Sequence, residues 1–209
     1  MIRFVYFDVG GVVIDDFSGN NKWEQLKNEL KIDSSNSDEF EEIWKKLEEE
    51  VVIGKDVESL LPILKEKFSN NIPEGYSLLN NGFVDRFQPN KNIWSIITEL
   101  KKKVPVGLLT NMYPGMFDAI KKRNILPPIE WNVILDSSIE MLKKPDARLF
   151  KLAEERAGLH GSEILFIDNT IGHIEEANKF GWNAYYYDSS NHKKSVKKLK
   201  KEIKSYHLT

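Results

Sequence analysis

Five short apolar segments rich in β-branched and aromatic residues recur along this sequence of 209 residues, and stretches with helical periodicity separate them. Several of the segments are apolar without interruption, as is typical of strands buried on both faces of a parallel sheet. Strands that alternate with helices predict βαβ units and an α/β fold built on a doubly wound parallel sheet. The expected strands span residues 2–7, 104–109, 131–135, 164–167 and 183–187, and the expected helices between them span residues 93–103, 115–124, 146–158 and 174–180.

Almost a hundred residues separate the first expected strand from the second, whereas a crossover between parallel strands commonly needs only a few tens. We therefore infer an insertion, and its periodicity predicts helices over residues 21–30, 37–50 and 57–68. The chain divides into an expected core domain, residues 1–14 and 89–209, and an expected helical cap, residues 15–88. A chain of this length suffices for one α/β domain with such an insertion, but not for two full-size domains.

The composition excludes several classes of protein. The chain has no cysteine, which rules out a disulfide framework, a thiolate nucleophile and a thiolate zinc site, so that any metal must be held mainly by oxygen. The apolar runs fall short of the roughly 18 residues that a membrane span needs, and we expect a cytoplasmic protein without a membrane partner. Residues 193–204 contain seven Lys and one Glu and predict an amphipathic helix with a solvated basic face; binding of nucleic acid or lipid head groups there is the alternative.

Polar residues follow four of the expected strands. They are Asp8 after the first strand, Thr110 and Asn111 after the second, Lys144 after the third, and Asp168 and Asn169 after the fourth. In an open parallel sheet the carboxyl ends of the strands gather at one edge, where ligands bind. Two nearby carboxylates need a cation between them or one must be protonated, and Mg²⁺ prefers oxygen ligands. A hydroxyl and a lysine suit the oxygens of a phosphoryl group, so this set predicts a phosphoryl-transfer site in which Asp8 is a nucleophile or a metal ligand.

The segments FDVGGVV, LLTN, KKPD and FIDNTIGHIEEANKFG resemble, in this order, the four motifs of the haloacid dehalogenase-like (HAD) hydrolase superfamily. The resemblance covers nearly the whole chain and implies a Rossmann-like core with a helical cap inserted after the first motif. It implies that Asp8 is the nucleophile, which forms an aspartyl-phosphate. It further implies a catalytic set of Asp8, Thr110 and Lys144, a substrate-binding set of Thr110, Asn111 and Lys144, and a magnesium site formed by Asp8, the backbone carbonyl of Gly10, Asp168 and Asn169.

Three positions depart from the family's pattern. Most of its phosphatases have a second Asp, acting as general acid and base, where this chain has Gly10; because such help is worth roughly 10²–10⁴-fold, we expect a slow enzyme or a favourable leaving group. Asn169 lacks the charge of a second carboxylate, which lowers the expected affinity for the metal. We interpret His173 as a hydrogen-bonding partner of the motif loop rather than as a ligand. Asp15 and Asp16 are interpreted as turn or hinge residues, with a surrogate acid as the alternative.

These observations together predict a magnesium-dependent phosphomonoesterase that acts on a small phosphorylated metabolite, such as a sugar phosphate, through an aspartyl-phosphate. A hydrolase of the 2-haloacid dehalogenase type is one alternative, because those enzymes also lack the second Asp. Their halide site uses an Arg from the cap, and Arg3 is the only Arg before residue 86 in this sequence. A catalytically degenerate binding protein is the other alternative.

Overall fold

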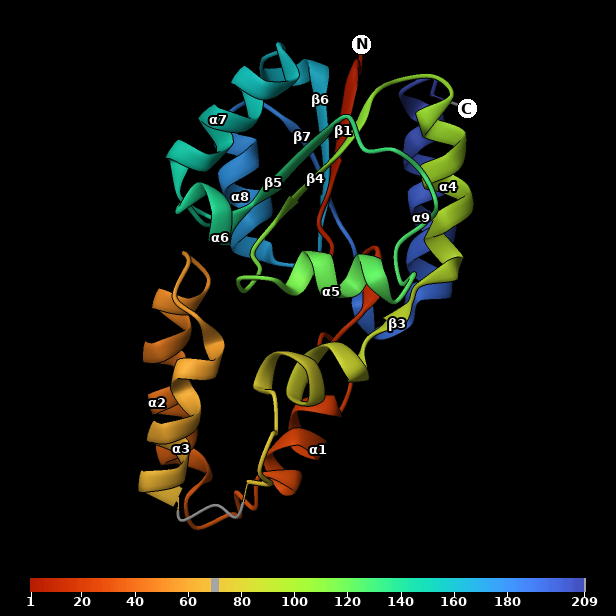
Figure 1. The fold of residues 1–209 in the computed structure, drawn as a ribbon. Coiled ribbons are helices and arrows are strands. Elements are labelled where there is room, and N and C mark those ends of the chain that lie inside the picture. Colours follow the sequence, from red (N-terminus) through yellow and green to blue (C-terminus); the bar gives the residue numbers. More distant parts are fainter. Residues whose placement is uncertain (69–71, 209) are drawn as a thin grey trace.

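The structure, a computed structural model, describes residues 1–68 and 72–208. Five parallel strands form one sheet in the order β5-β4-β1-β6-β7, which confirms the predicted doubly wound α/β fold. The strands are β1 (Phe4–Phe7), β4 (Val106–Thr110), β5 (Val133–Asp136), β6 (Ile164–Asp168) and β7 (Asn183–Tyr186). Figure 1 shows α4 (Lys91–Lys101) and α9 (His192–Ser205) on one face of the sheet, and α7 (Ala147–Ala157) and α8 (Ile171–Lys179) on the other.

The central strand β1 explains why the apolar segments are uninterrupted. Phe4 and Tyr6 belong to the hydrophobic cluster that contains residues of α7 and α8, whereas Val5 and Phe7 belong to the cluster that contains residues of α4 and α9. All four side chains are at most 3% exposed. Since successive side chains of a strand point to opposite faces, a strand covered by helices on both sides has no polar face.

Local signals set the ends of α7, the helix that follows the predicted lysine. The side chain of Asp146 accepts a hydrogen bond from the Arg148 N–H at 2.9 Å and caps the first turn. Gly158 ends the helix with a φ of 66°, a left-handed conformation that glycine adopts without a steric penalty. The helix expected at residues 174–180 begins earlier than predicted, at Ile171.

The described helices between β2 (Ile14–Asp15) and β3 (Gln88–Pro89) lie beyond the carboxyl ends of the sheet strands (Figure 1). The helices there are α1 (Lys22–Glu29), α2 (Ser37–Val51) and α3 (Leu60–Phe68), accompanied by short helical turns at Val57–Ser59, Leu78–Phe83 and Val84–Arg86. The chain leaves and re-enters the sheet region through β2 and β3, two paired segments which run antiparallel. The division into a core of residues 1–14 and 89–209 and a cap of residues 15–88 stays a prediction.

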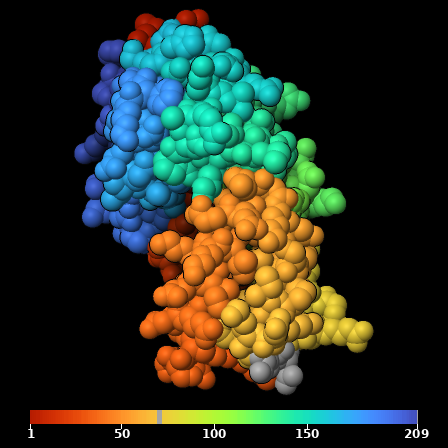
Figure 2. All heavy atoms as spheres, turned by 90° about the vertical axis from the view of Figure 1, so that its left-hand side faces the viewer, coloured from red at the N-terminus to blue at the C-terminus, as the bar shows by residue number. Residues whose placement is uncertain are grey.

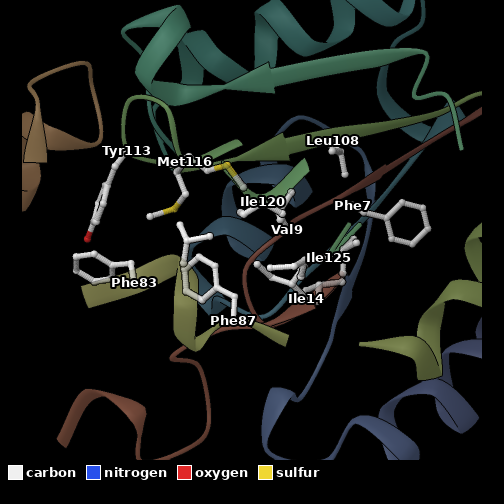
Figure 3. Packing of buried hydrophobic residues seen from close by; sticks show 14 of the residues in the cluster. Phe7, Val9, Ile14, Phe83, Phe87, Leu108, Tyr113, Met116, Ile120 and Ile125 are labelled. Atoms are coloured by element: carbon white, nitrogen blue, oxygen red, sulfur yellow. The ribbon is translucent and has the colours of Figure 1, made fainter. Parts of the chain in front are cut away.

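Apolar side chains join the two regions at the edge of the sheet. In Figure 3, Phe83 and Phe87 approach Tyr113 and Met116, and the rings of Phe83 and Tyr113 meet with centroids 5.1 Å apart. Met116 begins α5 (Met116–Lys122), which lies under the strand ends in Figure 1, while α6 (Ser137–Glu140) follows β5. Within residues 1–68 and 72–208, no helix combines the length and the apolarity that crossing a membrane requires.

Candidate active site

The register of the sheet brings the predicted strand-end residues to one edge. β1 pairs in parallel with β6 so that Phe7 lies opposite Ile167, and this register carries on to place Asp8 beside Asp168. β1 also pairs with β4, and that pairing places Thr110 at the same carboxyl edge. The edge therefore gathers two carboxylates and a hydroxyl from three adjacent strands.

Lys144 lies between the two carboxylates. Its Nζ is 3.0 Å from Asp8 Oδ1 and 2.5 Å from Asp168 Oδ2, and its side chain is fully buried. The side chain of Asn111 holds the backbone of this lysine: Asn111 Oδ1 accepts from the Lys144 N–H at 2.8 Å, and Asn111 Nδ2 donates to the Lys144 carbonyl at 3.0 Å. Asn111 thus fixes the position of Lys144, and its predicted contact with substrate stays a prediction.

Burial and the charge of Lys144 set the ionisation of the carboxyl groups. Burial raises the pKa of Asp8, and the opposing effect of Lys144 does not cancel this rise. Burial acts in the same direction on Asp168, but Lys144 and His173 outweigh it and hold the pKa of Asp168 below its usual value. Burial disfavours the charged form of Lys144, yet Asp168 and Asp8 raise its pKa. Asp168 and Lys144 therefore form the ionised pair, and a further positive charge would favour ionisation of Asp8.

Thr110 carries an unpaired polar atom in this site. The residue has no exposed surface, and its Oγ1 has no hydrogen-bond partner in the part of the chain that the structure describes. A buried hydroxyl without a partner costs free energy, and such groups in native structures call for an explanation. An oxygen of a bound ligand would supply the missing partner.

Asp8, Asp168 and His173 offer a possible metal-binding group, because one ligand atom from each lies within 4.8 Å of the others. The Nδ1 atom of His173 is 3.1 Å from both carboxylate oxygens of Asp168, which agrees with the interpretation of His173 as a hydrogen-bonding partner. Burial lowers the pKa of His173, and this favours its neutral form. When Asp8 is ionised, two carboxylates face one lysine, and the resulting negative charge suits a hard cation.

The two remaining predicted ligands lie next to this group. Asn169 donates through Nδ2 to Ser189 Oγ at 3.0 Å, which directs its amide nitrogen to a protein partner and leaves Oδ1 as the donor atom for a cation. Gly10 lies in the turn after Asp8 and forms a bridge with Ile14. The assignment of Gly10 and Asn169 as ligands stays a prediction.

A cavity of about 730 Å³ opens beside Lys144 and Asn111, between the strand ends and the inserted helices. Its size falls in the usual range of small-molecule sites. Six aromatic residues line it: Phe17, Trp23, Trp44, Phe83, Phe87 and Tyr113. No sequence pattern assigned Phe83 to the site, and the one signal for Tyr113 was its position three residues after Thr110.

Comparisons with known proteins identify relatives of this chain and of its fold. The family model of haloacid dehalogenase-like hydrolases matches residues 2–181. The fold is similar to that of a predicted HAD-like family hydrolase from Porphyromonas gingivalis, with a TM-score of 0.74 and 22% sequence identity over 95% of this chain and 98% of that chain. No curated protein matches the sequence.

Two further solved structures with this fold carry ligands. A HAD family enzyme from Bacteroides thetaiotaomicron, in complex with magnesium and inorganic phosphate, has a TM-score of 0.70 and 19% identity over 91% of this chain and 96% of that chain. L-2-haloacid dehalogenase from Xanthobacter autotrophicus, with chloropropionic acid covalently bound, has a TM-score of 0.61 and 17% identity over 90% of this chain and 78% of that chain.

Proposed function

The chain belongs to the haloacid dehalogenase-like hydrolases, and from this membership we propose that it hydrolyses a small phosphomonoester, such as a sugar phosphate, through a covalent intermediate on Asp8. One observation carries the proposal. The buried lysine Lys144 contacts both Asp8 and Asp168, beside a buried Thr110 hydroxyl that has no hydrogen-bond partner among the described residues. This arrangement presents a nucleophile next to two groups that can hold phosphoryl oxygens.

The residues divide the work in the proposed reaction. The Asp8 carboxylate attacks phosphorus in line and the bond to the alcohol oxygen breaks, which leaves a phosphoryl group on Asp8. The Lys144 ammonium and the Thr110 hydroxyl bind the equatorial oxygens, where negative charge is spread during transfer. Water then attacks the same phosphorus atom, which releases inorganic phosphate and regenerates the carboxylate.

Magnesium fits the donor set of this site. Asp8 and Asp168 would hold it together with Asn169 Oδ1, since Mg²⁺ takes oxygen ligands and keeps several waters. His173 would then orient Asp168 through their hydrogen bond. When bound, the ion would neutralise charge on the phosphoryl oxygens and favour the ionised form of Asp8. The magnesium and phosphate in the Bacteroides thetaiotaomicron enzyme support this choice.

The arginine residues favour a phosphatase over a dehalogenase. The halide site of a 2-haloacid dehalogenase uses an Arg from the cap. In residues 15–88 of this sequence, Arg86 is the one candidate. Arg86 instead pairs with Glu29 and donates to the carbonyl of Gly82. Among the described residues, no Arg lines the cavity.

The test is phosphate release from a panel of phosphomonoesters, including p-nitrophenyl phosphate, by the purified chain and by its Asp8→Asn variant. We expect turnover that requires Mg²⁺, stops on chelation and returns when Mg²⁺ is added back, with no turnover by Asp8→Asn. Full activity of Asp8→Asn would remove Asp8 as the nucleophile. Absence of activity in both proteins across the panel would favour a catalytically degenerate binding protein.

A further inference from the structure

Four carboxylates line the cavity beside Lys144, and three of them are already engaged. They are Asp16, Glu41, Glu48 and Glu49. Glu41 accepts from Lys27 Nζ at 2.9 Å. Glu48 accepts from the Tyr113 hydroxyl at 2.6 Å, and Glu49 pairs with Lys143. These three acids have a cation or a phenol as a partner, and their contacts account for their place in the cavity wall.

Asp16 differs from the other three. Its Oδ1 accepts a hydrogen bond from the Ser18 N–H at 2.8 Å, which is the contact of a turn-forming aspartate. Within residues 1–68 and 72–208, Ser18 is the one hydrogen-bond partner of this carboxyl group, and no ion pair engages it. The oxygen that does not accept from the Ser18 N–H, Oδ2, therefore stays available to a molecule in the cavity.

The free oxygen lies against the loop that carries the nucleophile. A Cβ atom built on Gly10, two residues after Asp8, would overlap Asp16 Oδ2. The φ of Gly10 lies outside the left-handed region, so the backbone conformation there does not itself demand glycine. The space that the missing side chain leaves is what admits the Asp16 carboxyl group, and the same cavity is bounded by Lys144.

We propose that Asp16 is the proton donor to the departing alcohol. This step rests on the proposed phosphatase function. As the bond between phosphorus and the alcohol oxygen breaks and the bond to Asp8 forms, the acid form of Asp16 gives its proton to that oxygen, and the product leaves as a neutral alcohol. The Asp16 carboxylate then accepts a proton from the water that attacks the phosphoryl group on Asp8, which restores the acid form and releases phosphate.

The dependence on the leaving group separates this role from a structural one. We expect Asp16→Asn to reduce kcat/KM for an alkyl phosphate by about 10²–10⁴-fold, because an alkoxide is a poor leaving group without a proton. For p-nitrophenyl phosphate, whose phenolate leaves readily, the loss should be below about tenfold. The matched control is Asp15→Asn: this neighbour pairs with Lys22 at 3.1 Å and should show no difference between the two substrates.

An equal loss for both substrates in a folded Asp16→Asn protein would overturn the proposal and assign Asp16 to the turn alone, and so would no loss for either. The proposed function has a separate readout. If the unmodified chain is active and Asp8→Asn is not, a failed Asp16 prediction leaves the phosphatase intact. If Asp8→Asn is fully active, the assignment of Asp8 as the nucleophile is wrong, whatever the result for Asp16.

Moving the carboxyl group provides a second test that does not depend on loss of activity. Gly10→Ala should reproduce the leaving-group dependence of Asp16→Asn, because the added methyl group displaces Asp16 Oδ2. The double variant Gly10→Asp with Asp16→Ala should recover at least tenfold of the alkyl phosphatase activity that Asp16→Ala loses. A folded double variant without recovery would contradict an acid at this place in the cavity.

Discussion

At the scale of single residues, replacing Lys144 is the sharpest test of the proposed chemistry, because this lysine lies between two buried carboxylates. In Lys144→Met the cation is lost while most of the apolar stem is kept, so the charge that favours ionisation of the two neighbouring carboxyl groups is gone. Asp8 already has a raised pKa, so a smaller fraction of the nucleophile is ionised and a phosphoryl-binding charge is lost as well. We expect kcat to fall at least about 10²-fold, measured as phosphate release.

The control for this prediction is Lys151→Met, which removes an exposed lysine of α7 and should leave phosphate release unchanged. A folded Lys144→Met protein with the activity of the unmodified chain would contradict the role given to Lys144. Circular dichroism of both variants would establish that they are folded, which separates loss of chemistry from loss of structure.

The residues that meet at the strand ends could be predicted from the sequence for a physical reason. Each uninterrupted apolar segment ends where polar residues begin, and parallel strands end at one edge, so Asp8, Thr110 and Asp168 were placed together without knowledge of any contact. The sequence did not determine the surroundings of Asp16. Its place beside Gly10 depends on the path of the turn between them and on a side-chain rotamer, and neither follows from periodicity.

At the scale of elements, the expected helices of the insertion agree closely with those observed; the helix expected at residues 21–30, for example, is α1 (Lys22–Glu29). Their apolar faces repeat at the helical period, and this signal is local. The pairing of β2 with β3 was not foreseen. Each has two residues, too few to show alternation, and Ile14 meets Pro89 across the whole insertion, so the pairing depends on where the inserted helices bring the chain back.

The start of α9, beside the paired segments β2 and β3, predicts that the free energy of unfolding depends on pH. Asn90 follows β3 and is 2% exposed, and its Nδ2 lies 3.1 Å from His192 Nδ1, which must be unprotonated to accept the hydrogen bond. Burial lowers the pKa of His192 below 6.5. Above about pH 6.5, His192 is unprotonated in both the folded and the unfolded chain. Below that pH the unfolded chain binds a proton at His192, whereas the folded chain, with its lower pKa, does not. The free energy of unfolding therefore decreases as pH falls.

Urea unfolding at pH 7.5 and pH 5.5 measures this effect. We expect His192→Asn to lower the free energy of unfolding at pH 7.5, and we expect the gap to the unmodified chain to narrow at pH 5.5. The narrowing is at most about 1.4 kcal/mol per pH unit for one proton. A constant gap at both pH values would show that His192 does not titrate differently in the two states.

At the scale of the whole molecule, the inserted helices are held against the sheet region by contacts on both sides of the cavity. Figure 2 shows the orange helical segment resting on the teal segment that follows β5, and two contacts join these segments. Ser137 Oγ donates to the Val52 carbonyl at 2.5 Å, and Lys143 pairs with Glu49. On the opposite side, Arg123 pairs with Asp85 at 2.6 Å. The sequence could not indicate these partners, because each pair combines residues far apart in the chain.

The hydrogen bond between Tyr113 and Glu48 joins the loop after β4 to α2 beside the cavity. It should therefore affect the fraction of molecules in which the inserted helices cover a bound substrate. Burial and Glu48 raise the pKa of Tyr113 well above its usual value, so the phenol remains a hydrogen-bond donor. Tyr113→Phe keeps the ring packed on Phe83 and removes the hydroxyl. The lost hydrogen bond is worth about 1 kcal/mol, which lowers the ratio of closed to open molecules roughly fivefold.

Because only the closed molecules bind, the apparent affinity falls with the fraction that is closed. We therefore expect Tyr113→Phe to raise KM for a phosphomonoester by up to about fivefold and to leave kcat within about twofold. Glu48→Ala, which removes the acceptor, should have a similar effect, and the double variant should be no worse than either single variant, because both remove one shared interaction. Steady-state kinetics of the four proteins measure this cycle. Additive effects, or a loss confined to kcat, would mean that this contact does not hold the helices closed over the substrate.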